Sequence, residues 1–387
     1  MLFYPAMKKI YGIICIGSCL LMSSCASDGI MEDTDQVGSE GFTVQLNLNT
    51  RSSFTRSEGH GRDDGSEAEN FINIINKDYQ IYIVDGEDDA RIISKFEPSS
   101  VVRKDDGTYR LLGTFYNEEG LKKIRFMALA NWKTAFTQGN YPEVPTEGDF
   151  YLDDLYTNKT NYNFVYPVDE SSVGETWMPK NETSGIPMVG LSVSQSIPEA
   201  GTSVPGQFPW IEVSSINMLR ALAKITVTDK TNDDDVELVS VNIKNYNSDG
   251  RFIQDGSKNE NKDWNEEATQ VTVPTLTEEP VKGMELYFNR SEDGKSFVAY
   301  VPEVDNNSPN EEDKCYLEVT AKLKGLEKNY QIHLGDYDNG TYVPGSFMDL
   351  LRNHWYNFDI RSVSANGIIL TVTVVDKWDV IHEMELE

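Results

Sequence analysis

Hydrophobic and polar residues alternate along many short stretches of this chain. In the first stretch, Phe42, Val44, Leu46 and Leu48 are apolar, and the residues between them are polar. A period of two residues is typical of a β-strand that buries one face. The same pattern, broken by Gly, Asn, Asp and Pro, predicts further strands over 79–84, 109–116, 124–130, 188–193, 210–213, 223–228, 237–244, 284–288, 297–301, 316–323, 330–334, 355–360 and 368–375.

Helical periodicity is scarce by comparison. Only residues 70–76 and 346–352 have a pattern that would suit a short helical piece. Many short strands with turn-rich spacers are typical of β-sandwiches or barrels. The pattern therefore predicts an all-β protein.

The spacing of the strands changes near residues 214–219. Before this point lies a loop-rich region over 132–180, and after it the strands follow one another more closely. A chain of 387 residues is long enough for two or three domains. We expect one β-sandwich over 41–218, with long loops, and a second over 219–387.

The N-terminus has the features of an export signal. Lys8 and Lys9 precede an apolar run over 10–22, and small residues then lead to Cys25. This order indicates a secretory signal, and the run is too short for a stable membrane span. Small residues before a Cys indicate a lipobox. We therefore expect residues 1–24 to be removed and Cys25 to be lipidated.

Two alternatives exist at this end of the chain. Cys19 also follows small residues, but its apolar run would be shorter, so Cys25 is favoured. The other alternative is an ordinary signal peptide with an incidental Cys. Acyl chains such as palmitate would hold the protein on the cell outer membrane. Residues 25–40 are polar and acidic, and they predict a flexible tether.

The charge of the chain excludes one class of partner. The chain has 63 acidic and 34 basic residues, a net charge of −29. Because a phosphate backbone requires a basic surface, we expect no nucleic acid partner.

The four cysteines predict no disulfide within the mature chain. Cys15 and Cys19 lie in the expected signal peptide, and Cys25 is the expected lipid site. Only Cys315 remains, in an alternating segment, where we expect a buried hydrophobic residue.

The residues needed for catalysis do not occur in recognisable patterns. The four histidines are His60, His333, His354 and His382, and none has the spacing of a zinc-protease motif. No G-x-S-x-G elbow, P-loop or G-x-G-x-x-G is present. We therefore expect no enzymatic activity, no catalytic residues and no cofactor.

Two further kinds of binding site were considered. Acidic residues over 231–237 and 336–341 would suit Ca²⁺, but such segments are more often solvated turns, and we expect no metal. Trp132, Trp177 and Trp210 would suit a platform for stacking on sugars. In β-sandwiches, however, Trp more often packs in the core.

Several motifs together resemble the fimbrillin family of Bacteroidales, which forms type V pili. A lipobox Cys25 precedes the alternating strand FTVQLNLN. RALAKITV (Arg220–Val227), LLRNHWYNFDI (Leu350–Ile360) and LTVTVVDKW (Leu370–Trp378) are similar to that family's central and closing strands. The resemblance extends from the lipobox to the C-terminus. It implies two transthyretin-like Greek-key β-sandwiches, export as a lipidated precursor, cleavage by an Arg-specific protease after the first strand, and polymerisation by strand exchange.

The two ends of the chain have similar hydrophobic patterns. Trp378, Val380, His382, Met384 and Leu386 would share one face of a strand, as do the four apolar residues of the first strand, and Ile381, Glu383, Glu385 and Glu387 would point the other way. A sheet that loses a strand exposes unpaired backbone groups, and another strand pairs with them readily. We expect the first strand, at a sheet edge, to be displaced by the C-terminal donor strand of a neighbouring subunit.

The release of the first strand requires a cut in the polar segment that follows it. Arg56 is our first choice for the cleavage site, because its distance from the strand resembles that in the family, and Arg51 is the second. Exposed polar segments are where proteases cut most readily. The alternative is that both are ordinary solvated arginines in a precursor that is never cut.

The sequence thus predicts a structural subunit of a cell-surface fimbria that supports adhesion. Its expected partners are other pilin subunits, the outer membrane through lipid, and a host or bacterial surface receptor. One alternative is an anchor or tip adhesin that does not polymerise. The other is a surface glycan-binding lipoprotein.

Overall fold

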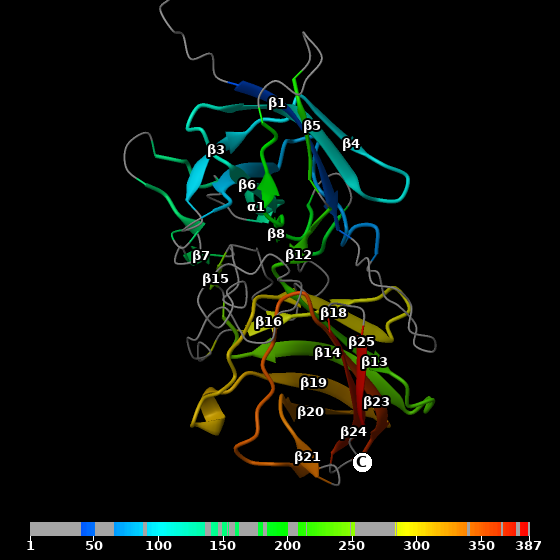
Figure 1. Ribbon diagram of the computed structural model, residues 1–387. Helices are drawn as coiled ribbons and strands as arrows, with labels where there is room; N and C mark the ends of the chain where they lie inside the picture. Colours follow the sequence, from blue (N-terminus) through cyan, green and yellow to red (C-terminus); the bar gives the residue numbers. More distant parts are fainter. Residues whose placement is uncertain are drawn as a thin grey trace, which may run out of the picture. The chain divides into compact units, whose positions relative to one another are not determined.

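The structure is a computed structural model (Figure 1). It describes residues 40–50, 66–87, 91–135, 141–145, 149–152, 154, 159–161, 177–180, 184–199, 208–213, 215–247, 249–251, 283, 285–338, 341–364, 367–376 and 380–385. Contacts between residues place Ser39–Glu387 in one compact unit. The expected signal peptide, the lipid site Cys25 and almost all of the tether lie outside the described residues.

Two sheets are built from the first half of the chain. The first sheet contains β10 (Trp210–Glu212), β1 (Glu40–Asn49), β5 (Tyr109–Asn117) and β4 (Ser100–Arg103), in that order, and β11 (Ile216–Asn217) also pairs with β1. The second contains β12 (Leu219–Arg220), β8 (Met188–Leu191), β6 (Lys123–Ala130), β2 (Tyr79–Asp85) and β3 (Ile92–Phe96), and β9 (Gln195–Ser196) pairs with β6.

Two further sheets come from the second half. The larger contains β17 (Asn289–Arg290), β18 (Ser296–Val301), β13 (Ala223–Asp229), β23 (Trp355–Val363), β24 (Ile368–Asp376) and β25 (Val380–Glu385), in that order. The smaller contains β16 (Glu285–Tyr287), β14 (Val236–Lys244), β19 (Tyr316–Leu323) and β20 (Leu326–His333). Two small ribbons pair β7 (Lys159–Asn161) with β15 (Asp249–Arg251), and β21 (Tyr337–Asp338) with β22 (Thr341–Tyr342).

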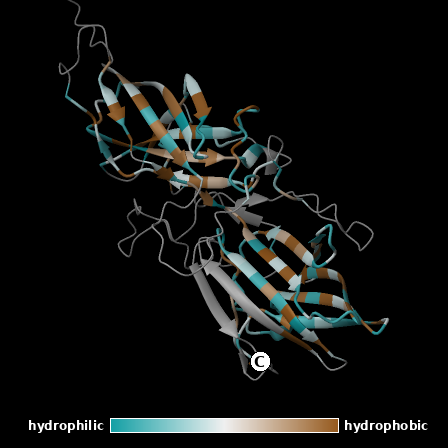
Figure 2. Cartoon of the chain, turned by 90° about the vertical axis from the view of Figure 1, so that its right-hand side faces the viewer, coloured by the Kyte–Doolittle hydropathy of each residue, from teal (hydrophilic) through white to brown (hydrophobic). Residues whose placement is uncertain are grey.

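Alternation along the strands produces two buried cores. Figure 2 shows hydrophobic and hydrophilic residues alternating along the strands of both halves. One core takes its buried side chains from residues between Phe42 and Leu222, with Tyr300 added. The other takes them from residues between Ala223 and Val363. The chain is thus all-β, with four main sheets and two sandwich cores, as the pattern predicts. The proposed boundary at 218/219 stays a prediction.

Helical structure is minimal in the described part of the chain. It consists of the single turn α1 (Trp132–Ala135), a 3₁₀ turn over Glu311–Asp313, and helical residues at Leu152 and Asp154. The helical pieces expected near 70–76 and 346–352 are wrong, because these segments form turns and extended loops. None of the described helices is long and apolar enough to span a membrane.

Strand β20 begins four residues earlier than its pattern predicts. The first four residues of this edge strand, Leu326–Asn329, are all exposed, so no alternation between buried and exposed residues marks them. The connection to β19 consists of Lys324 and Gly325, which both have positive φ. Two residues of that conformation form the tight turn that matches the twist of a hairpin.

Candidate functional site

Strand β1 lies inside its sheet, with a neighbour on each side. It pairs antiparallel with β5 over nine residue pairs, from Glu40–Asn117 to Leu48–Tyr109. On its other side it pairs parallel with β10 around Val44 and with β11 around Leu48. The expectation of an edge strand is therefore wrong. Alternation predicts which face of a strand is buried, but it does not predict how many neighbours the strand has.

The inner face of β1 is part of the first core. Phe42, Val44, Leu46 and Leu48 are each at most 1% exposed. The Phe42 ring stacks on Phe115 of β5, with 6.2 Å between the ring centroids. Burial of such side chains stabilises a fold by about 1.5–3 kcal/mol each. The loss of β1 would therefore open a long apolar slot with unpaired backbone groups on both sides.

The end of β1 is fixed by hydrogen bonds. The Asn49 carbonyl accepts one from the Met218 amide at 2.8 Å, and the Asn49 side chain donates to the Asn217 side chain at 3.2 Å. The next carbonyl, that of Thr50, accepts one from the Arg220 guanidinium at 3.3 Å. Arg220 thus holds the last described residue before the segment that contains the predicted cleavage sites.

The same guanidinium also holds Glu69 and Asn70, which follow segment 51–65. Arg220 Nε donates to the Glu69 carbonyl at 3.2 Å, and Nη2 donates to the Asn70 side chain. Arg220 is almost fully buried, and it also donates to Asn353 Oδ1 from its backbone amide and from Nη1, each at 3.2 Å. One buried cation therefore contacts both ends of segment 51–65.

A buried ion pair strengthens the second of these anchors. The Glu69 carboxylate lies 2.9 Å from Lys224 Nζ and accepts a hydrogen bond from the Tyr300 hydroxyl. Burial alone would raise the pKa of Glu69, but the charge of Lys224 and the bonds from Tyr300, Lys224 and Ser66 outweigh it and lower that pKa. The segment after residue 65 is thus held by contacts that a cut between residues 50 and 66 would leave in place.

The motifs of the sequence meet at these contacts. Arg220 and Lys224 belong to RALAKITV, and Asn353 belongs to LLRNHWYNFDI. Strand β13 pairs parallel with β23, where Lys224 lies opposite Trp355, and β23 pairs with β24. Sequence reasoning did not assign Glu69 and Asn70, because nothing in a turn-rich segment indicates which distant side chains will contact it.

The predicted cleavage sites Arg51 and Arg56 lie outside the described residues. So do Trp378 and Leu386 of the predicted donor strand. The segment between them forms β25, which pairs with β24 of the same chain over six residue pairs, from Thr371–Glu385 to Asp376–Val380. Val380 and Met384 lie within it. β25 is the last strand of its sheet and has a neighbour on one side only.

The three tryptophans do not form a common platform, in line with the preference for core packing. Trp132 is buried, and its Nε1 donates to the Met188 carbonyl at 2.8 Å. Trp177 packs against Tyr300, with 5.9 Å between the ring centroids. Only Trp210 is exposed, at 57%. Two of the three side chains therefore pack within the fold, as is common for Trp in β-sandwiches.

Two other exposed aromatic residues lie on the same face of the sheet as Trp210. Phe208 and Tyr116 are 46% and 50% exposed, and their rings meet edge to face at 6.0 Å. Trp210 pairs with Thr43, and Tyr116 pairs with Gly41, two residues earlier on β1. Sequence reasoning missed this aromatic cluster (Tyr116, Phe208 and Trp210), because its residues are far apart along the chain.

The acidic segments that would suit Ca²⁺ have partners of their own. The Asp229 and Asp233 carboxylates accept hydrogen bonds from the backbone amides of Thr231 and Asp235, each at 2.9 Å. Such bonds cap turns. No group of three or more potential metal-ligating side chains occurs among the described residues.

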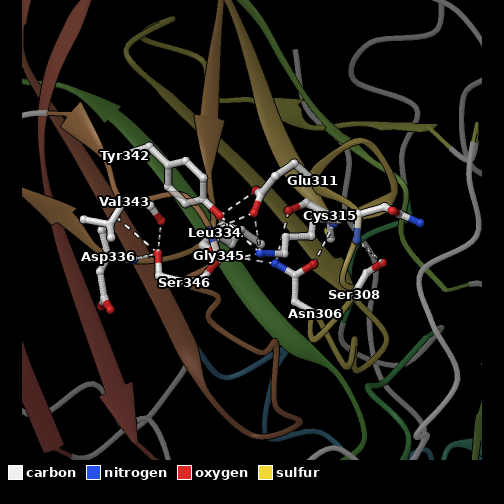
Figure 3. A network of polar contacts seen from close by, with 12 residues as sticks. Asn306, Ser308, Glu311, Cys315, Leu334, Asp336, Tyr342, Val343, Gly345 and Ser346 are labelled. Carbon is white, nitrogen blue, oxygen red and sulfur yellow. Dashed lines mark hydrogen bonds and ion pairs between the residues drawn. The ribbon is translucent and has the colours of Figure 1, made fainter.

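The loop that follows Asp336 is held by a separate network (Figure 3). The Asp336 amide donates to Ser346 Oγ at 2.8 Å. Lys314 Nζ lies 2.9 Å from both Glu311 Oε1 and the Ser346 carbonyl, and the Tyr342 hydroxyl donates to Glu311 Oε2 at 2.8 Å. These bonds join the loop to the start of β19.

Cys315 is the free cysteine of the described residues. It is fully buried, and this burial raises the pKa of its thiol well above the ordinary value. The side chain is therefore a small hydrophobic part of the second core, as its alternation predicts.

Comparisons with known proteins give fold-level matches. No family model matches the chain, and no curated protein matches it. The tip fimbrial protein Mfa3 from Porphyromonas gingivalis, with a C-terminal truncation, aligns with a TM-score of 0.50 at 14% identity, over 87% of this chain and 99% of its own.

Two other solved structures are similar at lower scores. The fimbrilin FimA from Porphyromonas gingivalis W83 aligns with a TM-score of 0.47 at 14% identity, over 88% of this chain and 98% of its own. A putative cell adhesion protein from Parabacteroides distasonis aligns with a TM-score of 0.47 at 16% identity, over 89% and 99%. Across most of its length, the chain therefore matches solved fimbrial proteins of Bacteroidales, and it shares the fold of the fimbrial tip protein Mfa3.

Proposed function

We propose that this chain is a structural subunit of a cell-surface fimbria, built from two transthyretin-like sandwiches and exported as a lipoprotein with its lipid on Cys25. Cleavage after Arg56 or Arg51 releases β1, and the C-terminal strand of another subunit fills the vacated slot. The observation that supports this most is the position of β1: it is an interior strand with four buried side chains, and it lies between the tether and the segment with both arginines.

The pairing of the two strands defines which backbone hydrogen bonds the exchange replaces. In its own chain β25 has one neighbour, β24. In the slot, the same strand would pair with β5 on one side and with β10 and β11 on the other. At about 0.5–1.5 kcal/mol for each backbone hydrogen bond, the pairs gained in the slot equal those that β1 gives up, so the exchange depends on how well the side chains of the incoming strand pack there.

Cleavage would also change how the subunit is held on the membrane. The lipid on Cys25 and the strand β1 both precede the cut, so only non-covalent contacts of β1 would then join the body to the anchor. The body stays intact at the cut, because Glu69, Lys224 and Arg220 hold the chain after residue 65. Displacement of β1 thus releases the subunit from its anchor and opens its slot in one step.

Limited proteolysis tests this function. We expect trypsin to cut the purified precursor after Arg51 or Arg56 and to produce heat-stable ladders on a denaturing gel. Trypsin can also cut after Arg62 in the same segment, so a precursor in which Arg51, Arg56 and Arg62 are all replaced by Ala is the matched control and should give no ladders. Efficient cleavage in this segment that leaves only monomers would contradict polymerisation by strand exchange.

A second candidate function is sugar binding by the aromatic cluster. Exposed aromatic rings stack on sugars, and Phe208, Tyr116 and Trp210 lie on one face. A glycan array probed with the unaltered chain and with Trp210→Ala tests it. Binding that the substitution abolishes would support this function, whereas an array without signal would exclude it for the glycans presented.

A further inference from the structure

Two cations converge on one uncharged side chain at the outer face of β1. Lys104 Nζ donates a hydrogen bond to Asn47 Oδ1 at 3.3 Å. Arg110 of β5 lies directly opposite Asn47 in the antiparallel pairing. Residues opposite each other in such a pair have side chains on the same face, with their Cβ atoms about 5 Å apart. Both cations therefore border the position of the Asn47 side chain.

Neither cation has a carboxylate partner among the described residues. Lys104 Nζ bonds only to Asn47 there, and no described side chain pairs with the half-buried guanidinium of Arg110. The two cations thus leave a positive charge beside the Asn47 side chain, in a chain with 63 acidic and 34 basic residues. A strand with a carboxylate at the Asn47 position would fit this part of the slot better than β1 does.

The C-terminal tail has such a residue at the matching position. When Val380 takes the place of Phe42 and Met384 that of Leu46, with the tail running in the direction of β1, Glu385 falls at Asn47. The same alignment places Ile381 at Thr43, beside the exposed Trp210. Glu383 falls at Gln45, which pairs with Glu212 of β10, so this position would bring two negative charges together. The electrostatic attraction between the tail and the slot therefore comes from the Asn47 position.

We propose that Lys104 and Arg110 select the incoming strand by its acidic residue, with Glu385 at the Asn47 position. This inference rests on the proposed function and adds the residues that decide which strand fits. In the opposite direction, with Met384 at Phe42 and Val380 at Leu46, Asp379 would fall at the Asn47 position. The cations therefore favour an acidic residue at this position in either direction of the strand.

Charge reversal in the full chain tests the inference. We expect Lys104→Glu combined with Arg110→Glu to slow ladder formation after trypsin treatment about tenfold or more, because two like charges then meet Glu385. Adding Glu385→Lys to this variant should restore the rate. Adding Glu383→Lys in its place is the matched control and should not restore it. The uncut variants should unfold at the temperature of the unaltered chain, since Asn47 is neutral.

The outcomes separate this inference from the proposed function. Two outcomes would overturn the inference alone. One is a ladder rate that the reversal of Lys104 and Arg110 leaves unchanged, and the other is a rescue by Glu383→Lys as complete as that by Glu385→Lys. An unaltered chain that is cut and forms no ladders would overturn the proposed function and this inference with it. If the double reversal unfolds the chain, Lys104→Gln with Arg110→Gln takes its place, and an unchanged ladder rate in that variant would likewise overturn the inference.

Discussion

At the scale of single residues, the contacts around segment 51–65 differ on its two sides. On the side before the segment, the described contact of Arg220 is the hydrogen bond to the Thr50 carbonyl. After it, Arg220 holds Glu69 and Asn70, and Lys224 pairs with the Glu69 carboxylate. A cut between the two sides therefore leaves the downstream chain anchored, while the upstream strand keeps its pairing with β5 and the hydrogen bonds of Asn49 and Thr50.

The Glu69 pair makes stability depend on pH. Because the pKa of Glu69 is lower in the folded chain than its ordinary value, its contribution is complete above that ordinary value and is lost as the pH falls through the lowered one. We expect Glu69→Gln to lower the free energy of unfolding by on the order of 3 kcal/mol at neutral pH. Denaturant titrations at several pH values measure this, and the variant should lose less stability in acid than the unaltered chain.

An exposed ion pair provides the control for Glu69. Glu67 lies 2.7 Å from Arg103 at the surface. Because exposed pairs contribute about 0–1 kcal/mol, Glu67→Gln should change stability and its pH dependence little. Equal losses of stability in the two variants would show that the burial of Glu69 does not increase its contribution to stability.

At the scale of elements, β1 and β25 occupy different kinds of position. β1 has strands on both sides and an apolar inner face, whereas β25 has β24 on one side only. Alternation predicts both strands from the sequence. Their neighbours depend on pairing between residues far apart in the chain, such as Thr43 with Trp210, and no local pattern encodes such pairing. β3 and β4 were missed because they are short and only partly buried.

Weakening the inner face of β1 should speed its release. We expect Leu46→Ala to lower the stability of the uncut chain by about 2–5 kcal/mol, because it leaves a cavity in the core. After the cut, the same substitution should make ladders form faster. Gln45→Ala, on the outer face of β1, is the control. A ladder rate that Leu46→Ala leaves unchanged would argue that release of β1 does not limit assembly.

Removal of the C-terminal tail should separate the two roles of a subunit, which are to donate a strand and to accept one. A chain without residues 377–387 loses an edge strand, so we expect it to stay folded, with β24 at the edge of its sheet. After trypsin treatment it should form no ladders alone. Mixed with full-length subunits, it should shorten their ladders, because it accepts a strand and donates none. Ladders from the truncated chain alone would show that another segment fills the slot.

At the scale of the whole molecule, the sequence predicted the fold class better than the arrangement of strands. The two cores and the all-β architecture follow from the period-two pattern of segments such as Phe42–Leu48. The interior position of β1 and the Arg220 contacts did not follow, because they depend on how distant segments meet. The motifs around Arg220 and Asn353 marked the right regions without indicating that the two residues touch.

The most direct test of the account locks β1 in place. Thr43 of β1 lies opposite Thr114 of β5 on the outer face, so cysteines at both positions are close enough for a disulfide. After trypsin cuts segment 51–65, we predict that the oxidised variant stays monomeric on a denaturing gel and that added reductant starts ladder formation. Ladders of equal length and rate with and without the disulfide would contradict the claim that β1 must leave.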